Sequence, residues 1–163
     1  MGSRTAGAAG LGEVPIRREG RAAEGDFRMR RYLLDTCAMG DLINRRKGVH
    51  ERARAARLGG ARLGTCIPVL GELFFGIEFS QTRAENRARL IRAITGLSLW
   101  PYTREAAEEH GRHAAQLWRA GRTMQQVDMQ VAAIALTLSQ CLVVSEDTDL
   151  LAVPGLSVVN WTS

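Results

Sequence analysis

The chain has 163 residues, of which 45% are hydrophobic and 24% charged, enough for one compact domain with a buried core. Its three cysteines are scattered and form no CxxC pair, which excludes a disulfide scaffold and indicates reduced thiols in the cytoplasm. No apolar run approaches the roughly 20 residues that span a bilayer, and no signal peptide is evident, so we expect no membrane anchor.

The net charge is +5 with a pI near 9.8, and Lys47 is the only lysine. Arginine binds phosphates through two parallel hydrogen bonds, so this composition is compatible with a nucleic-acid partner. Codon usage in a GC-rich genome explains the same arginine content equally well, and composition alone leaves both readings open.

Residues 1–28 are rich in Gly, Ala, Arg and Glu and lack apolar periodicity. They are predicted to be a flexible leader, and translation starting instead at Met29 is an open alternative. The functional domain is expected over residues 29–163.

Short apolar runs alternate with longer helical patterns throughout the domain. The expected strands are residues 31–36, 61–66, 97–102, 141–145 and 156–161. The expected helices are residues 39–58 with a break at Gly48, 67–80 with Pro68 in the first turn, 82–94, 103–119 and 123–139. Thr82 with Glu85, and Thr123 with Gln126, match the capping-box pattern. Strands separated by helices predict a three-layer α/β/α sandwich with a central parallel sheet.

Acidic residues occupy two unusual kinds of position. Asp35, Asp147 and Asp149 follow predicted strands, and ligands of parallel α/β domains bind at the carboxyl ends of strands. Glu72 and Asp128 lie within apolar helices, where an unpaired charge is costly. Each acid has an ordinary explanation as a turn former or a solvated side chain. Together, however, they favour a shared divalent cation, and all-carboxylate ligation selects Mg²⁺ or Mn²⁺.

Other chemistries lack their residues. His110 and His113 share a helix face, but we expect that face to be solvated, and no further zinc ligand lies near them in the sequence. The chain contains no GxxxxGK[ST] phosphate loop, no GxGxxG after a strand and no GxSxG elbow. The DTC sequence at the first strand lacks the second aspartate of a DxDxT phosphotransferase. A receiver-type domain would need a lysine at a late strand.

Four segments occur in a familiar order: YLLDT, GELFFGI, VDMQVAAIAL and VVSEDTDLLAVPGL. In this order the chain from Met29 onward resembles the PIN-domain ribonucleases, most closely the VapC-like toxins of type II toxin–antitoxin systems. The resemblance implies a metal-dependent endoribonuclease with a PIN-like fold. It also implies that four acids hold Mg²⁺ or Mn²⁺: Asp35, Glu72, Asp128 and Asp147.

The resemblance extends to neighbouring residues. Thr36 and Ser145 would be supporting hydroxyls that orient ligands or water. The last motif is one residue tighter than its commoner form, so Asp149 competes with Asp147 for the fourth acid position; Asp147 is favoured because it stands nearer the strand end. Asp149 would otherwise hold a water molecule. Cys37 stands where many relatives have asparagine, and we expect it to affect packing and not ligation.

The resemblance further implies three kinds of partner: an RNA substrate, a cognate antitoxin and a second copy in a homodimer. Basic residues are candidates for the RNA contact, with a solvated helix face as the alternative for each: Arg45, Arg46 and Lys47, and Arg83, Arg87, Arg89 and Arg92. Four apolar residues are candidates for an antitoxin groove, with ordinary core packing as the alternative: Phe74, Phe75, Phe79 and Leu90.

Two other functions stay open. The first is a catalytically silent PIN-like protein that binds RNA or serves as a scaffold, whose usual mark is loss of an acid from the quartet; no acid is lost here. The second is a DNA-directed PIN nuclease, which would ordinarily carry extra DNA-clamping segments.

Overall fold

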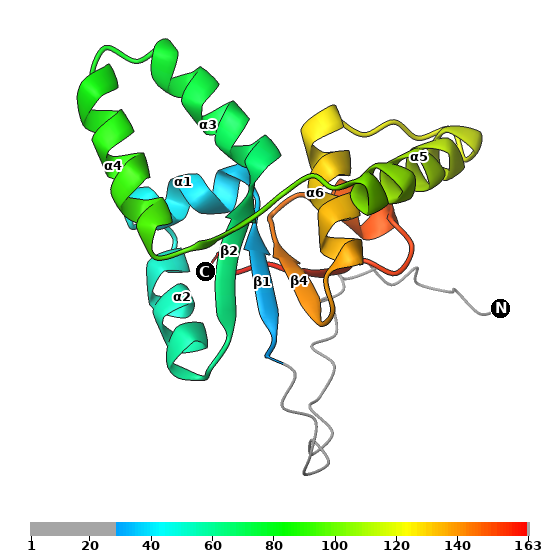
Figure 1. Ribbon diagram of the computed structural model, residues 1–163, viewed down its shortest axis with the longest axis horizontal. Coiled ribbons are helices and arrows are strands. Elements are labelled where there is room, and N and C mark those ends of the chain that lie inside the picture. Colours follow the sequence, from blue (N-terminus) through cyan, green and yellow to red (C-terminus); the bar gives the residue numbers. More distant parts are fainter. Residues whose placement is uncertain (1–28, 163) are drawn as a thin grey trace, which may run out of the picture.

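The computed structural model describes residues 29–162, so the predicted leader over residues 1–28 lies outside the described residues. The strands are β1 (Arg31–Leu34), β2 (Arg62–Cys66), β3 (Ser98–Trp100), β4 (Cys141–Val144) and β5 (Ser157–Val159). The helices are α1 (Thr36–Asn44), α2 (Val49–Leu58), α3 (Ile67–Glu78), α4 (Arg83–Thr95), α5 (Arg104–Arg119), α6 (Gln126–Thr137) and the 3₁₀ helix η1 (Thr148–Ala152). Figure 1 shows their arrangement.

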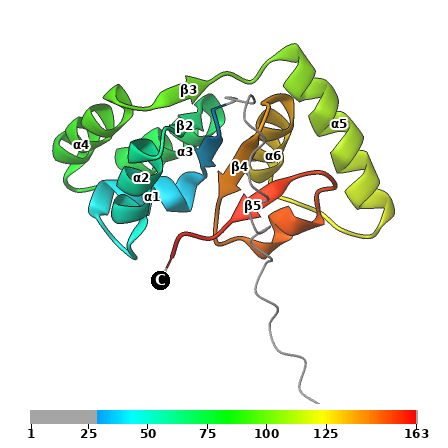
Figure 2. The same cartoon turned by 90° about the horizontal axis from the view of Figure 1, so that it is seen from below.

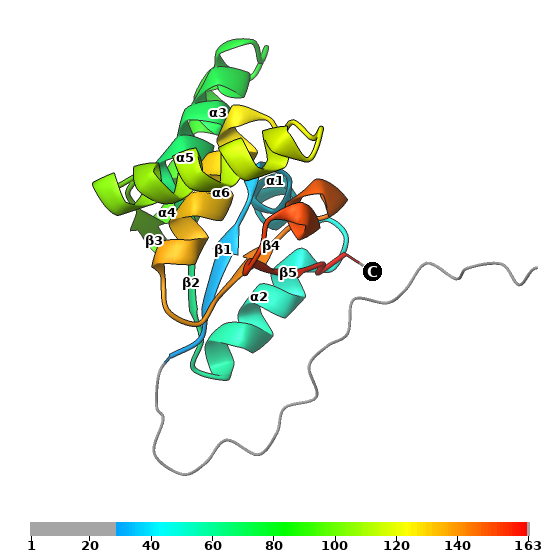
Figure 3. The ribbon, with the colours of Figure 1, turned by 90° about the vertical axis from the view of Figure 1, so that its right-hand side faces the viewer.

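All five strands form one parallel sheet in the order β3-β2-β1-β4-β5, which confirms the predicted architecture. The α5 and α6 helices cover one face, and α1 and α2 cover the other (Figures 2 and 3). The α3 and α4 helices form a hairpin that projects beyond the carboxyl ends of the strands (Figure 1). The order of strands reverses at β1, since the chain passes first to β2 and later to β4 on the opposite side.

The core lies between the central strands and the two helical layers. Leu33 and Leu34 of β1 and Val143 and Val144 of β4 are buried, as their continuous apolar runs predict for strands covered on both faces. Residues 131–135 of α6 are all buried because the helix lies between the sheet and α5. No helix among residues 29–162 has the length and apolarity that crossing a bilayer requires.

The tight contact between β2 and β3 depends on a glycine. A Cβ atom added at Gly64 would lie 2.7 Å from Cζ3 of the Trp100 side chain and would also overlap Ser98. Trp100 is buried. Glycine therefore allows the two strands and this indole ring to pack together at the edge of the sheet.

Neither predicted capping box forms. Thr82 precedes α4, but its side chain accepts no hydrogen bond from a backbone N–H of the helix. Instead, the Asn86 side-chain amide donates to the Thr82 and Ser80 hydroxyls, at 3.1 and 2.7 Å. Thr103, in contrast, caps α5 by accepting from the Ala106 amide at 3.2 Å.

The second capping box fails because α6 begins later than the sequence suggests. Gln125 keeps an extended backbone (φ −60°, ψ 148°), and the helix starts at Gln126 and not near Thr123. Asp128 therefore lies in the first turn of α6, whereas a helix capped by Thr123 would place it in the second turn. The partial positive charge of a helix N-terminus stabilises a carboxylate there.

Candidate metal-binding and nuclease site

Asp35 lies where β1 ends and α1 begins. Its Oδ1 atom accepts a hydrogen bond from the Ala38 amide at 2.7 Å, so the side chain is the N-cap of α1. The residue is only 6% exposed. Burial raises the pKa of Asp35, hydrogen bonds from Ser145 and Ala38 oppose this rise, and the charges of Asp147 and Glu146 add to it.

The segment after β4 contributes the next acids. The buried Ser145 hydroxyl accepts from the Asp147 amide at 2.9 Å, and Asp147 Oδ1 accepts from the Asp149 amide at 2.8 Å. Asp147 is thus the N-cap of η1, a helix that the sequence reading missed. The charge of Asp147 adds to the rise in the pKa of Asp35, which lies at the end of β1.

Glu72 reaches the same edge from α3. Its Oε2 atom accepts a hydrogen bond from the Thr36 hydroxyl, although the two residues are far apart in the sequence. Thr36 directly follows Asp35, so this contact joins the middle of α3 to the end of β1. The predicted role of Thr36 as a supporting hydroxyl therefore has a defined partner in Glu72.

Asp128, in the first turn of α6, shows that the acids share one space. Burial is the first cause that raises its pKa from 3.8 to about 6, followed by the charges of Asp147, Glu72, Asp35 and Asp149. The charges of the three other quartet acids, and that of Asp149, thus act on Asp128. They come from β1, α3 and the β4–η1 segment, and together they create an excess of negative charge at the carboxyl edge of the sheet.

The chemistry of this donor set fits a hard divalent cation. Every candidate ligand is a carboxylate or hydroxyl oxygen, and the carboxylates all carry negative charge that a cation would neutralise. Within residues 29–162, however, no three His, Cys, Asp or Glu side chains gather in metal-holding geometry. The carboxylates are instead engaged with local hydrogen-bond donors such as Thr36, Ser145 and the Ala38 amide.

Cys37 is exposed on the first turn of α1. Burial of its sulfur and the charge of Asp35 raise the pKa of the thiol. The thiol form is a poor ligand for a hard cation. Cys66 is buried and Cys141 is half-buried, and all three cysteines are free.

Lys47 borders the acidic site through contacts that the sequence did not reveal. Its Nζ atom lies 2.6 Å from Glu146 Oε1 and 3.4 Å from Asp41 Oδ2. Asp41 is buried on α1, and Glu146 directly precedes Asp147. Lys47 therefore joins the α1–α2 connection to the segment that carries Asp147. Backbone turns at Arg45 and Lys47, with φ of 53° and 51°, redirect the chain here.

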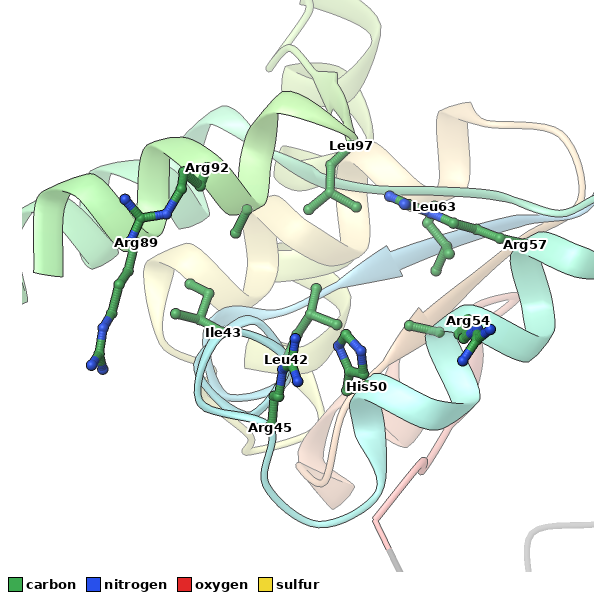
Figure 4. Close-up of a pocket in the computed structure, with 12 residues that line it drawn as sticks. Leu42, Ile43, Arg45, His50, Arg54, Arg57, Leu63, Arg89, Arg92 and Leu97 are labelled. Carbon is green, nitrogen blue, oxygen red and sulfur yellow. The ribbon is translucent and has the colours of Figure 1, made fainter.

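The other basic candidates separate into different surroundings. Arg46 is exposed, and Arg45 lines a cavity of about 510 Å³ between α1, α2 and α4. Figure 4 shows arginine side chains around an aliphatic floor. The arginines that line this pocket, which we call the arginine pocket, are Arg45, Arg54, Arg57, Arg89 and Arg92. Its floor includes Leu42, Ile43, Leu63 and Leu97.

The four apolar candidates for an antitoxin groove on α3 and α4 lie in different surroundings, and the alternative of core packing holds for Leu90. Leu90 is 1% exposed and belongs to the core. Phe74 is half-buried beneath the guanidinium of Arg87, whose Cζ atom lies 5.2 Å from the ring centroid. Phe75 and Phe79 are exposed. Helical periodicity separates these side chains because neighbouring residues point in different directions.

The expectation for His113 is wrong. The residue is buried on α5, where Nε2 lies 3.1 Å from Glu109 Oε2 and Nδ1 has no hydrogen-bond partner. His110 instead lies beside Tyr102, with Nδ1 3.1 Å from the phenolic oxygen. The sequence EEHGRH looks solvated because its charged residues surround a face that α5 packs inward.

Known structures share this fold. A chain in the structure of VapBC2 from Rickettsia felis bound to a DNA fragment from their promoter superposes with a TM-score of 0.74 at 19% identity, covering 80% of this chain and 98% of that chain. A chain in the structure of DNA-bound VapBC from Salmonella typhimurium superposes with a TM-score of 0.71 at 26% identity, covering 82% of this chain and 99% of that chain. A chain in the structure of VapBC-1 from nontypeable Haemophilus influenzae superposes with a TM-score of 0.72 at 22% identity, covering 82% of this chain and 99% of that chain.

A comparison with curated proteins finds no match. The family model described as PIN domain matches residues 32–156, a stretch that contains all the acids of the site. This match spans more than half of the sequence and agrees with the fold. The chain therefore belongs to the PIN domain family.

Proposed function

We propose that this protein is a metal-dependent endoribonuclease and the toxin of a toxin–antitoxin pair. The observation that carries the proposal is the set of acids at the carboxyl edge of the sheet, where Thr36 links Glu72 to the end of β1, and where burial and the charges of four other acids raise the pKa of Asp128. Such an accumulation of like charge destabilises a protein unless it serves a bound cation. The PIN domain match and the likeness to VapBC structures support the same activity.

In this proposal Asp35, Glu72, Asp128 and Asp147 would hold Mg²⁺ or Mn²⁺, which when bound activates water and neutralises charge on the phosphate. The residues of the chain prepare that arrangement. Thr36 orients the Glu72 carboxylate through its hydroxyl, and Ser145 orients Asp35. Asp149, which is exposed, would hold a water molecule. The expected products carry 5′-phosphate and 3′-hydroxyl ends.

The partner in this proposal is an antitoxin segment with acidic and aliphatic side chains. The arginine pocket supports it, because cations surround an aliphatic floor that is suited to Leu or Val. Arg45, Arg89 and Arg92, first considered as RNA contacts, would then serve antitoxin binding. Homodimer formation and a cytoplasmic location complete the proposal, as the resemblance to VapC-like toxins implies.

The test is cleavage of a mixed small-RNA pool by the full chain in Mg²⁺, Mn²⁺ or EDTA. Asp35→Asn and Asp128→Asn should each abolish cutting, whereas Glu108→Gln, an exposed acid of α5, should leave it unchanged. Fragment ends identify the chemistry. Cutting that persists in EDTA, or products with 2′,3′-cyclic phosphate, would refute the metal-dependent mechanism. Binding of RNA without cutting would favour a catalytically silent RNA-binding or scaffold protein. Cutting of DNA but not of RNA would favour a DNA-directed PIN nuclease.

A further inference from the structure

Two phenylalanines on α3 keep most of their surface in contact with solvent. Phe75 is 68% exposed and Phe79 is 76% exposed. Their ring centroids lie 4.9 Å apart with an interplanar angle of 64°, so the rings touch and form a joint aromatic surface. Neither ring contributes to the buried core, and each would gain from contact with a further apolar surface.

This aromatic surface lies on the same side of α3 as Glu72. Phe75 and Phe79 follow Glu72 by three and seven residues, the spacing of one helical face. At 1.5 Å per residue, their backbone positions lie about 4.5 and 10 Å along the helix axis from Glu72. The two rings therefore continue outward from the acidic site.

A glycine leaves this face accessible. Gly76 is exposed and shares the face, and a Cβ atom added there would meet nothing within 4 Å. Packing inside the domain thus gives no reason for a glycine, although glycine weakens a helix interior relative to alanine. The absence of a side chain lets a flat group approach the helix backbone beside the rings.

Positive charge accompanies the rings. The α4 helix runs beside α3 in the opposite direction (Figure 1). It carries Arg87, whose guanidinium lies over Phe74, and Arg83, whose NH1 atom lies 3.5 Å from Glu78 of α3. Both arginines are exposed, so positive charge for a polyanion lies on the helix that packs beside α3. Planar rings beside arginines complement a single nucleic-acid strand, which has flat bases and anionic phosphates.

Building on the proposed nuclease function, we infer that Phe75 and Phe79 form a base-stacking subsite for unpaired RNA next to the scissile phosphate. Bases within a duplex already stack on one another, so only nucleotides in single strands or loops can lie on these rings. Aromatic stacking accepts every base. The subsite therefore selects unpaired RNA structure and not a base sequence.

The experiment uses an RNA oligonucleotide without secondary structure that carries 2-aminopurine. Binding is measured by anisotropy and by quenching of 2-aminopurine, with the full chain carrying Asp35→Asn so that the RNA stays intact. Adding Phe75→Leu or Phe79→Leu should weaken binding at least about fivefold per ring and reduce quenching, because leucine retains apolar character without an aromatic face. Phe75→Trp and Phe79→Trp, which keep an aromatic face, should retain both the RNA affinity and the quenching of the parent.

Trp118→Leu is the matched control, since Trp118 is 74% exposed on α5, in a different layer of the molecule. This change should leave RNA affinity unchanged. Equal affinity of the parent and the double leucine variant would overturn the inference. A changed oligomeric state of that variant without RNA, measured by light scattering, would also overturn it, because the face would then belong to a second copy.

Cleavage by the chain without Asp35→Asn separates this inference from the proposed function. If the protein cuts RNA and the double leucine variant binds and cuts equally well, only the stacking subsite is refuted. If the protein does not cut RNA but its affinity depends on both rings, the subsite stands and the nuclease function is refuted. Absence of RNA binding would refute both.

Discussion

Asp35 is both a structural cap and a member of the acidic site. Its carboxylate accepts a hydrogen bond from the Ala38 amide at the start of α1, which is the usual role of an N-cap side chain. The same carboxylate is close enough to Asp147 for their charges to interact. The choice between turn former and site residue therefore does not arise, because the end of β1 and the start of α1 meet at this edge.

This double use predicts different outcomes for two substitutions at Asp35. Asparagine caps helices about as well as aspartate, so Asp35→Asn should preserve stability while removing the charge. Asp35→Ala removes the cap and should cost about 1 kcal/mol. Urea unfolding of both variants in EDTA measures the difference. Equal stability of the two would show that the Ala38 hydrogen bond contributes nothing measurable.

Asp128 predicts a pH-dependent stability in the metal-free protein. Its pKa is about 6 in the folded chain against 3.8 as the reference value, so the folded state binds more protons between these values. Stability should consequently fall as pH rises from about 4 to 6, and the cost persists at neutral pH. Because the side chain is half-buried and solvent screens it, we expect Asp128→Asn to stabilise by about 1 kcal/mol at pH 7.

Chemical unfolding at several pH values in EDTA checks this expectation. The advantage of Asp128→Asn over the parent should shrink as the pH falls toward 4 and disappear below about pH 3, where Asp128 is protonated in both states. Glu108→Gln serves as the control, as its side chain is exposed on α5 and pairs only with Arg104 at 3.1 Å. A constant difference between Asp128→Asn and the parent across this pH range would contradict the assigned cause.

At the scale of elements, two threonines that look alike in the sequence differ in the structure. Each threonine directly precedes a helix, where its hydroxyl could accept a hydrogen bond from the backbone N–H three residues later. Thr103 accepts that hydrogen bond, whereas Thr82 does not, since the hydroxyls of Ser80 and Thr82 interact with Asn86. A local sequence pattern could not distinguish them, because Asn86 offers a competing partner.

This contrast predicts unequal costs of removing the two hydroxyls. Thr103→Ala should destabilise the protein by about 1 kcal/mol through loss of a real N-cap. Thr82→Ala should cost less, because no backbone amide of α4 loses a partner. Thermal unfolding followed by circular dichroism measures both changes under one condition. A larger loss for Thr82→Ala would show that the hydroxyl contacts of Asn86 contribute more than a helix cap does.

At the scale of the whole molecule, the sheet and the acids were predictable, and the contacts around them were not. Continuous apolar runs such as residues 141–144 identify buried strands, and the topology of parallel sheets then brings their carboxyl ends together. The link from Lys47 to Glu146 and Asp41, and the inward orientation of His113, depend on packing between distant segments. No periodicity in the sequence encodes such pairings.

If the acidic site holds a cation, the entire fold should become more stable when the cation is added. Binding to the folded state alone contributes about 2.7 kcal/mol at a concentration 100 times the Kd. The melting temperature should therefore rise with Mg²⁺ or Mn²⁺, and Asp128→Asn should weaken the rise. Differential scanning fluorimetry with a matched ionic strength of NaCl separates specific binding from screening. An equal rise in NaCl would contradict a specific site.

The central position of β1 has a consequence for synthesis of the chain. This strand is made before β4, with which it pairs, and the first residue of β4, Cys141, lies opposite Arg31. Contacts between such distant segments form slowly and only after both have been made. A nascent chain that ends before β4 leaves one edge of β1 open and lacks Asp147. A nuclease of this design would stay inactive on the ribosome until the segment after β4 has been made.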